Sequence, residues 1–454
     1  MALILFLIFV IIEIGFAASG ILRKPTKTRW QIKRLVVNVV EFFTYIVLLL
    51  LPGIDFSFRF KALALLLVIR IFLASLATIF ARNNENLKKV VAMVSSAVIS
   101  IVLIAISMIP AFMFSDYKGR ETTGEYKVAE TQAILVDANR VEEFETDGSN
   151  REVPVHFYYP QNITEIQADT LPLVIFSHGA FGYYQSNSST YMELASNGYV
   201  VVSLDHPYHS FFTEDTDGKT ITVDTTFFQS AMDIGSKDVP EAEIFDVTSQ
   251  WMELRVNDMN FVIDALEEAG AADSLTDSFY LNENNEETIL SVIKATDFDK
   301  IGLMGHSLGG ATAVTVGRRE DVSAVIDLDG TMLGEETGVI DGEIQINEAP
   351  YETPLLSVEN EEHHRQAMEA DKNSYAYVNN VILNNASCGY ETYFMNSGHM
   401  NFTDLPLFAP ALANMLGTGS IDAEECIDTM NGIVLNFYDC YLKNTGEFSV
   451  EESY

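Results

Sequence analysis

The residues best suited to chemistry form the segment 305–309, which reads Gly-His-Ser-Leu-Gly and matches the pattern G-x-S-x-G. An apolar run at 300–304 precedes it, and a predicted helix begins near Ala311. Between a strand and a helix, such a serine lies on a tight, strained turn that exposes its hydroxyl and accepts only small residues two positions away. The N-terminus of the following helix favours developing negative charge. We therefore predict that Ser307 is a nucleophile.

A serine nucleophile needs a general base, and that base needs a carboxylate to orient it. Among the eight histidines, His399 fits best because it follows a strand-then-turn pattern near the end of the chain. His363 and His364 stand among charged residues, which indicates a solvated surface. His178 is interpreted as a packed residue of its loop. The base is therefore predicted to be His399.

Two carboxylates could orient this histidine. Asp329 follows the predicted strand 322–328, and Glu359 follows the predicted strand 354–358. Sites in parallel sheets collect at the carboxyl ends of the strands, and this position favours Asp329 modestly. The residues themselves leave Glu359 open as the alternative.

Acyl transfer also requires hydrogen-bond donors for the oxyanion. The first predicted donor is the backbone N–H of Leu308, directly after the nucleophile. The second should come from the glycine-rich loop after the predicted strand 171–176, where Ala180 is the preferred donor and its neighbours Gly179 and Phe181 are alternatives.

The elements that position these residues are predicted strands alternating with helices. Continuous apolar strands are typical of a sheet that is covered on both faces, as in parallel α/β folds. Residues 249–268 show helical spacing, and 423–442 could close the fold. The segment 211–244 is acidic and rich in turns. The predicted strands are 133–136, 153–159, 171–176, 199–204, 300–304, 322–328 and 354–358.

The first 115 residues contain four apolar runs, and a helix needs about 20 apolar residues to cross a bilayer. Their basic loops lie between the first and second runs and between the third and fourth, which predicts that the domain following them is extracytoplasmic. We predict a four-helix transmembrane domain (1–115), a polar linker (116–130) and a hydrolase domain (131–454), hence a multi-pass protein of the cell membrane. Glu13 and Arg70 lie within spans and could neutralise each other. The four runs are 2–21, 35–51, 62–80 and 90–114.

The net charge of the chain changes sign near residue 115, where the apolar runs end. Residues 1–115 hold 12 Lys/Arg and 4 Asp/Glu, whereas residues 116–454 hold 15 and 60, for a net charge of −37. An acidic domain of this kind argues against a nucleic-acid partner. Outside the cytoplasm, the cysteines Cys388, Cys426 and Cys440 could form one disulfide or none.

Three segments resemble the plasma-type platelet-activating-factor acetylhydrolases, also called lipoprotein-associated phospholipases, and their bacterial relatives. They are the strand and loop at 172–179, the segment 305–312, and the residues 326–329; the residues from His399 to Asp404 are also similar. The resemblance implies an α/β-hydrolase fold and a calcium-independent serine esterase that removes short or oxidised acyl chains from phospholipids. It also implies Asp329 as the acid, Leu308 and Ala180 as the oxyanion donors, and no metal or organic cofactor.

The sequence thus predicts a membrane-anchored serine ester hydrolase that acts on a lipid or small ester through Ser307, His399 and Asp329. A general carboxylesterase, lipase or polyester-type hydrolase is the first alternative, since one triad serves many esters. Acyl transfer to another alcohol is a variant of the same chemistry. An inactive cell-surface binding protein is the alternative from another class.

Overall fold

The structure is a computed structural model that describes residues 1–454 except 52–53, 237–238, 273 and 371–376. It divides into two compact units. The first comprises Met1–Lys118 together with Leu407–Met415, and the second comprises Gly119–Pro406 and Leu416–Tyr454. The short segment belongs to the first unit because the backbone N–H of Ser115 donates to the carbonyl of Phe408 at 2.8 Å.

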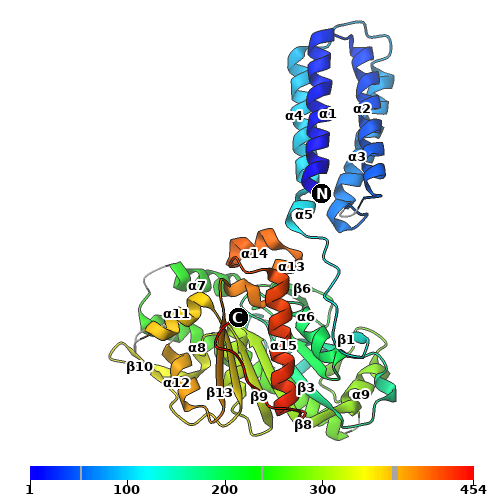
Figure 1. The fold of residues 1–454 in the computed structure, drawn as a ribbon. Helices are drawn as coiled ribbons and strands as arrows, with labels where there is room; N and C mark the ends of the chain where they lie inside the picture. Colours follow the sequence, from blue (N-terminus) through cyan, green and yellow to red (C-terminus); the bar gives the residue numbers. More distant parts are fainter. Residues whose placement is uncertain (52–53, 237–238, 273, 371–376) are drawn as a thin grey trace. The chain divides into compact units, whose positions relative to one another are not determined.

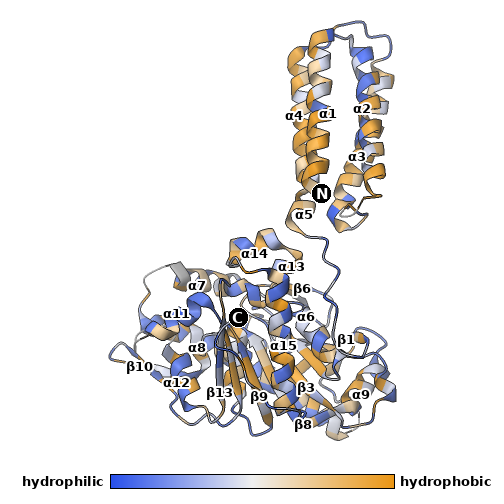
Figure 2. Cartoon of the chain, viewed as in Figure 1, coloured by the Kyte–Doolittle hydropathy of each residue, from blue (hydrophilic) through white to orange (hydrophobic). Residues whose placement is uncertain are grey.

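The first unit is helical (Figure 1). Three of its helices, α1, α3 and α4, are long and apolar enough to cross a membrane. Their residues are mostly apolar, as the orange ribbon in Figure 2 shows, and many of their large apolar side chains are exposed. The helices are α1 (Ala2–Arg23), α2 (Lys27–Leu48), α3 (Phe58–Phe80), α4 (Val90–Ser107), α5 (Ile109–Met113) and α14 (Pro410–Leu416).

The prediction of four spanning helices is wrong in its count, because α2 does not qualify among the described residues. This helix ends at Leu48, so the apolar residues 49–51 lie outside it. The helix itself contains Lys33, Arg34 and Glu41, and these charges interrupt every stretch of spanning length. Its polar residues instead face the interior of the helical unit, where Arg34, Asn38 and Glu41 are buried.

A buried ionic cluster joins α1, α2 and α3. The predicted contact between Glu13 and Arg70 is present as an ion pair. Glu13 also accepts two hydrogen bonds from Arg34, at 2.6 and 2.7 Å, and Arg70 pairs with Glu41 at 2.8 Å. All four side chains are almost fully buried. Two carboxylates therefore balance two guanidinium groups away from solvent, where an unpaired charge would cost several kcal/mol.

The second unit is built on a nine-stranded sheet with the order β13-β12-β9-β8-β3-β4-β2-β1-β7. Strands β13 to β4 in this order pair in parallel, whereas β4, β2, β1 and β7 pair antiparallel. The strands are β1 (Val128–Val141), β2 (Asn150–Pro160), β3 (Leu171–Ser177), β4 (Val200–Leu204), β7 (Phe279–Tyr280), β8 (Thr296–His306), β9 (Val322–Leu328), β12 (Leu355–Asn360) and β13 (Gly389–Phe394).

Helices cover both faces of this sheet, as the apolar strands predict. Ile301 and Leu303 of β8 belong to the apolar core that also contains Met259 of α8. The intervening Gly302 lies on the other face, where an added Cβ would be 2.6 Å from Tyr438 of α15. Because successive side chains of β8 point to opposite faces of the sheet, one face is covered by a layer with α8 and α10 and the other by a layer with α6 and α15.

The other elements of this unit comprise the covering helices and the connections between the strands. The acidic segment 211–244 folds as a hairpin, the helix α7 and the beginning of α8. The elements are α6 (Ser188–Ser196), β5 (Phe212–Glu214), β6 (Thr220–Thr222), α7 (Thr225–Ser236), α8 (Glu241–Ala272), α9 (Glu286–Ala295), α10 (Leu308–Val316), β10 (Glu336–Ile340), β11 (Glu343–Ile346), α11 (Glu361–Glu369), α12 (Tyr377–Asn385), α13 (Leu405–Phe408) and α15 (Ala423–Tyr441), with short 3-10 turns at Ile163–Glu165, Leu333–Glu335 and His399–Phe402.

Each predicted strand corresponds to a strand of the structure, and the two longer predicted helices correspond to α8 and α15. The three cysteines are free thiols, so the predicted option of a disulfide is not realised.

Candidate active site

Ser307 occupies the turn between β8 and α10. Its backbone has φ 55° and ψ −124°, a strained conformation for a residue with a side chain. Glycine is required on both sides of it. An added Cβ would lie 2.1 Å from the backbone of Gly309 if placed on Gly305, and 2.0 Å from the carbonyl oxygen of Ser177 if placed on Gly309. The spacing of the motif is thus a steric requirement of the turn.

Asp329 and His399 meet at the carboxyl ends of neighbouring strands. His399 Nδ1 lies 2.6 Å from Asp329 Oδ2, although 70 residues separate them in the chain. Asp329 follows β9 with φ 57° and is 4% exposed. Burial alone would raise the pKa of Asp329, but hydrogen bonds from His363 and His399 hold it below its usual range. This carboxylate is therefore ionised and oriented toward His399.

His399 also lies against the turn that carries Ser307. The rings of His306 and His399 have their centroids 4.6 Å apart, and His306 Nε2 lies 3.1 Å from the carbonyl oxygen of His399. The side chain of His399 is 40% exposed and Ser307 is partly exposed, so a solute can reach both. The structure therefore joins His399 to Asp329 and places His399 beside the turn that carries Ser307, while the assignment of the three residues as base, acid and nucleophile stays a prediction.

Two further residues hold Asp329, and the sequence analysis missed both. The backbone N–H and the side-chain amide of Asn360 donate to its two oxygens at 2.8 and 2.6 Å. His363 Nδ1 lies 3.2 Å from Asp329 Oδ1. The interpretation of His363 as a solvated surface residue is wrong, since only 8% of it is exposed. No local pattern reveals this role, because α11 folds back over the end of β9 only in the tertiary structure.

The alternative acid, Glu359, has no hydrogen bond to His399. It is 1% exposed and forms its ion pair with His364 at 3.4 Å instead. Glu359, His364 and Glu391 form a cluster whose ligand atoms lie close enough together to hold a metal ion.

The loop after β3 packs directly on the nucleophile turn. An added Cβ on Gly179 would lie 3.2 Å from Ser307 Cβ. Phe181, one of the alternative oxyanion donors, gives its backbone N–H to the carbonyl of His209 at 3.2 Å. The N–H groups of Gly179, Ala180 and Leu308 donate to no acceptor within the described parts of the chain, so Gly179 stays open as the alternative to Ala180. Leu308 and one of these two loop residues could supply the pair of donors that an oxyanion hole requires.

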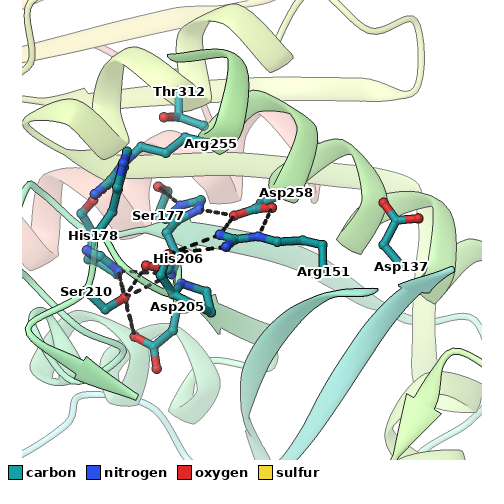
Figure 3. A network of polar contacts seen from close by, with 12 residues as sticks. Asp137, Arg151, Ser177, His178, Asp205, His206, Ser210, Arg255, Asp258 and Thr312 are labelled. Carbon is teal, nitrogen blue, oxygen red and sulfur yellow. Dashed lines mark hydrogen bonds and ion pairs between the residues drawn. The ribbon is translucent and has the colours of Figure 1, made fainter. Parts of the chain in front are cut away.

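A second Ser-His-Asp arrangement lies beneath this loop (Figure 3). Ser177 Oγ lies 2.8 Å from His206 Nε2, and His206 Nδ1 lies 2.9 Å from Asp258 Oδ2. All three residues are fully buried, so no substrate can reach them. Burial lowers the pKa of His206 to about 4, which keeps its ring neutral. This arrangement is structural: it fixes the end of β3, from which the oxyanion loop departs.

Arg255 of α8 connects the same region to the loop (Figure 3). Its side chain is 0% exposed, and Nη1 and Nη2 donate to the carbonyls of His178 and Gly179 at 2.5 and 3.4 Å. When the carbonyls of a peptide segment are held on one side, its N–H groups point to the other. The carbonyls of His178 and Gly179 share their peptide groups with the N–H groups of Gly179 and Ala180, so Arg255 is placed to orient both loop N–H groups, and the N–H of Gly182 holds the carbonyl of Gly179 as well, at 3.0 Å.

An apolar cluster lines the other side of the turn. Leu308 packs with Phe227 of α7 and with Leu333, and Ala180 and Trp251 pack against them. Phe227 comes from the acidic, turn-rich segment 211–244. That segment supplies an apolar wall beside the nucleophile, of the kind that holds an acyl chain.

Comparison with known proteins agrees with this geometry. The sequence model of the family described as "Platelet-activating factor acetylhydrolase, isoform II" matches residues 144–453. The chain belongs to this family. The acetylhydrolase family resemblance noted from the sequence is thereby confirmed, and the family consists of serine ester hydrolases.

Relatives of the acetylhydrolase family match part of their own length. The platelet-activating factor acetylhydrolase of Canis lupus familiaris is 24% identical over 302 residues, which are 62% of this chain and 60% of the dog protein. That of Bos taurus is 28% identical over 177 residues, which are 36% of each protein. A probable 1-alkyl-2-acetylglycerophosphocholine esterase of Arthroderma benhamiae is 24% identical over 166 residues, 36% of this chain and 33% of that protein.

A solved structure agrees in fold. The ferulic acid esterase from Streptomyces cinnamoneus superimposes with a TM-score of 0.50 at 20% identity, covering 72% of this chain and 94% of that one. The second unit therefore has the mostly parallel α/β fold of an esterase.

Proposed function

We propose that the protein is a serine ester hydrolase in which Ser307 attacks the ester carbonyl and forms an acyl-enzyme. The observation that carries the proposal is the 2.6 Å contact between His399 and Asp329, made beside a serine that is held at φ 55° between β8 and α10. His399 Nε2 takes the proton of Ser307 and later gives it to the leaving alcohol. Asp329 keeps the other ring nitrogen protonated and stabilises the imidazolium that forms.

The oxyanion of the tetrahedral intermediate accepts hydrogen bonds from the N–H groups of Leu308 and Ala180. Both donors are free and adjacent to the serine, and α10 begins at Leu308, so its N-terminus adds a favourable dipole. Water then attacks the acyl-enzyme with His399 as base, which releases the acid and restores Ser307. The site residues thus supply the nucleophile, the proton transfers and the hydrogen bonds that these steps require.

The substrate is a phospholipid with a short or oxidised acyl chain. Family membership supports the phospholipid, because the relatives named above carry the names of enzymes that act on 1-alkyl-2-acetylglycerophosphocholine and platelet-activating factor. The apolar wall of Leu308, Phe227 and Trp251 supports an acyl group beside the serine. A general ester would be accommodated by the same triad, so a substrate panel has to separate the two.

The N-terminal helices anchor the protein in a membrane, with the hydrolase domain extracytoplasmic. Three of them are long and apolar enough to span. The two basic loops meet at one end of the helical unit, where Lys27 N–H donates to Asn86 and Lys88 N–H donates to Pro25, at 2.8 and 2.9 Å. The chain leaves the other end, where Arg59 pairs with Asp116 at 3.3 Å. Although α2 is not apolar enough to qualify by itself, it runs back between the same two ends with its charges buried against α1 and α3, so the chain crosses an even number of times. Because basic loops stay in the cytoplasm, this arrangement supports an extracytoplasmic catalytic domain.

Labelling of membranes with a fluorophosphonate probe tests the catalytic proposal. We expect labelling of the wild type and none of Ser307→Ala, with Ser177→Ala as a matched control that leaves the accessible serine in place. A labelled enzyme is then given short-acyl phospholipids, long-acyl phospholipids and simple esters. Folded wild-type protein that resists the probe would refute the proposal and favour a binding protein, and equal rates on all esters would refute the phospholipid preference.

A further inference from the structure

The cluster of Glu359, His364 and Glu391 lies on β12, β13 and α11, next in sequence to the residues that hold Asp329. Glu359 is the last residue but one of β12, Glu391 lies inside the edge strand β13, and His364 lies in the first turn of α11. One ligand atom from each residue lies within 4.8 Å of those of the other two. The catalytic proposal uses none of the three.

Glu359 is the unusual member. It is 1% exposed, and neither of its carboxylate oxygens has a hydrogen-bond partner among the residues that the structure describes. Its nearest opposite charge is His364, whose Nδ1 lies 3.4 Å from Glu359 Oε2. A buried carboxylate without donors is costly, and burial raises its pKa accordingly. The structure thus aims an unsatisfied oxygen ligand into the cluster.

The other two ligands are ordered and accessible. The ring of His364 stacks on Tyr393 at 4.1 Å with an interplanar angle of 8°, which fixes the direction of Nδ1. That nitrogen lies 2.8 Å from Glu391 Oε1. The side chain of Glu391 is 36% exposed, so the cluster opens to solvent at the edge of the sheet.

We propose that Glu359, His364 and Glu391 bind one Zn²⁺ ion. Ligands that lie about 2.1 Å from a tetrahedral zinc are about 3.4 Å from each other. Glu359 Oε2 is already 3.4 Å from His364 Nδ1, whereas Glu391 Oε1, at 2.8 Å, would move outward by ~0.6 Å to admit the ion. An imidazole nitrogen with two carboxylates suits Zn²⁺, whereas Ca²⁺ requires six to eight oxygens. Two carboxylates balance the charge of the ion, and water fills the remaining position from the open side.

The ion would link α11 to the strands β12 and β13. The neighbours of its ligands, Asn360 and His363, are the residues that hold Asp329. Zinc would therefore stabilise the support of the proposed catalytic acid without contacting a substrate. Binding itself does not depend on the ester hydrolysis proposed above, because it involves other side chains.

The test uses the full chain in detergent micelles, stripped with a chelator and titrated with Zn²⁺ alone by calorimetry, with bound metal counted by mass spectrometry. We expect one equivalent of tightly bound zinc and a higher Tm for the wild type. Glu359→Gln and Glu391→Gln should each weaken binding at least ~10-fold and abolish the shift in Tm. Glu391 is partly exposed, so its variant tests the site even if Glu359→Gln fails to fold.

Two controls make the result specific. Glu362→Gln removes the same charge from the same helix, but that residue pairs with Arg365 outside the cluster and should bind zinc as the wild type does. His399→Gln should also retain binding, which separates this site from zinc held at the proposed triad. The proposal would be overturned if the wild type bound no equivalent of zinc tightly, or if both cluster variants bound zinc as the wild type does. Loss of zinc binding in His399→Gln would also overturn it.

Discussion

The substitution Arg255→Met should lower catalytic activity while leaving the fold largely intact. The guanidinium is 0% exposed, and burial lowers its pKa to about 9. It donates to the carbonyls of His178 and Gly179 but forms no ion pair within the described residues. Methionine has nearly the same length and no charge, so it approximately keeps the volume and removes these two hydrogen bonds together with the one from Nε to His209 Nδ1 at 3.4 Å.

The expected loss of activity follows from these distances. The hydrogen bond of 2.5 Å to His178 is the strong one, and a bond from a charged donor is worth about 1.5–3 kcal/mol. Without it the loop can relax, and a displacement of about 1 Å in a positioned group costs about 100-fold in rate. We therefore expect kcat/KM to fall about 100-fold, equivalent to about 2.7 kcal/mol of transition-state stabilisation. The free energy of unfolding should change by less than ~2 kcal/mol, because a buried charge disappears together with its hydrogen bonds.

The assay compares hydrolysis of a chromogenic acetate ester, with kcat and KM separated, with unfolding in urea. Arg151 provides a contrasting variant: it pairs with Glu142 at 2.9 Å and with Asp258 at 2.7 Å, so Arg151→Met leaves two buried carboxylates and should cost about 3–5 kcal/mol of stability. Arg365→Met, at an exposed position whose ion pairs with Glu362 and Glu369 are also exposed, should change neither quantity appreciably. Wild-type kcat in folded Arg255→Met would refute the positioning role.

Three further predictions follow. Asp329→Asn should lower kcat by about 10³–10⁴ with little change in KM, because the amide cannot hold the required tautomer of His399, and steady-state kinetics would show a smaller effect if Glu359 were the acid. Burial alone would lower the pKa of His363, but the hydrogen bond to Asp329 and nearby carboxylates raise it to about 9 from an unfolded value of 6.5. The resulting stabilisation, of about 3 kcal/mol, should be complete below pH 6.5 and disappear as the pH rises through 9. Urea unfolding should therefore show a higher stability at pH 6 than at pH 9.5 in the wild type, and His363→Gln should lack this difference. Glu13→Gln should destabilise the helical unit by about 3–5 kcal/mol by leaving Arg34 and Arg70 underbalanced, measured by thermal aggregation in detergent, with Glu85→Gln as the exposed control.

Local sequence determined the elements and the chemistry of the turn. The glycines at 305 and 309 can be read from the sequence because a serine at positive φ on a strand-to-helix turn excludes side chains at both positions. Apolar strand-length runs predicted the strands because burial on both faces of a parallel sheet leaves a continuous signal. The apolar helices α1, α3 and α4 were equally evident, since length and hydropathy suffice to recognise them.

Tertiary structure decided the rest. Whether Asp329 or Glu359 faces His399 depends on how β9, β12 and β13 align, and that alignment also brings Asn360 and His363 onto the acid. The role of Arg255 arises because α8 crosses the loop after β3, 76 residues away in sequence. The charges of α2 are accommodated only when Glu13 and Arg70 from other helices surround them. Such contacts join residues far apart in the chain, and no local period or spacing records them. The sequence by itself therefore determined which residues could react, and only the folded chain decided which residues hold them in place.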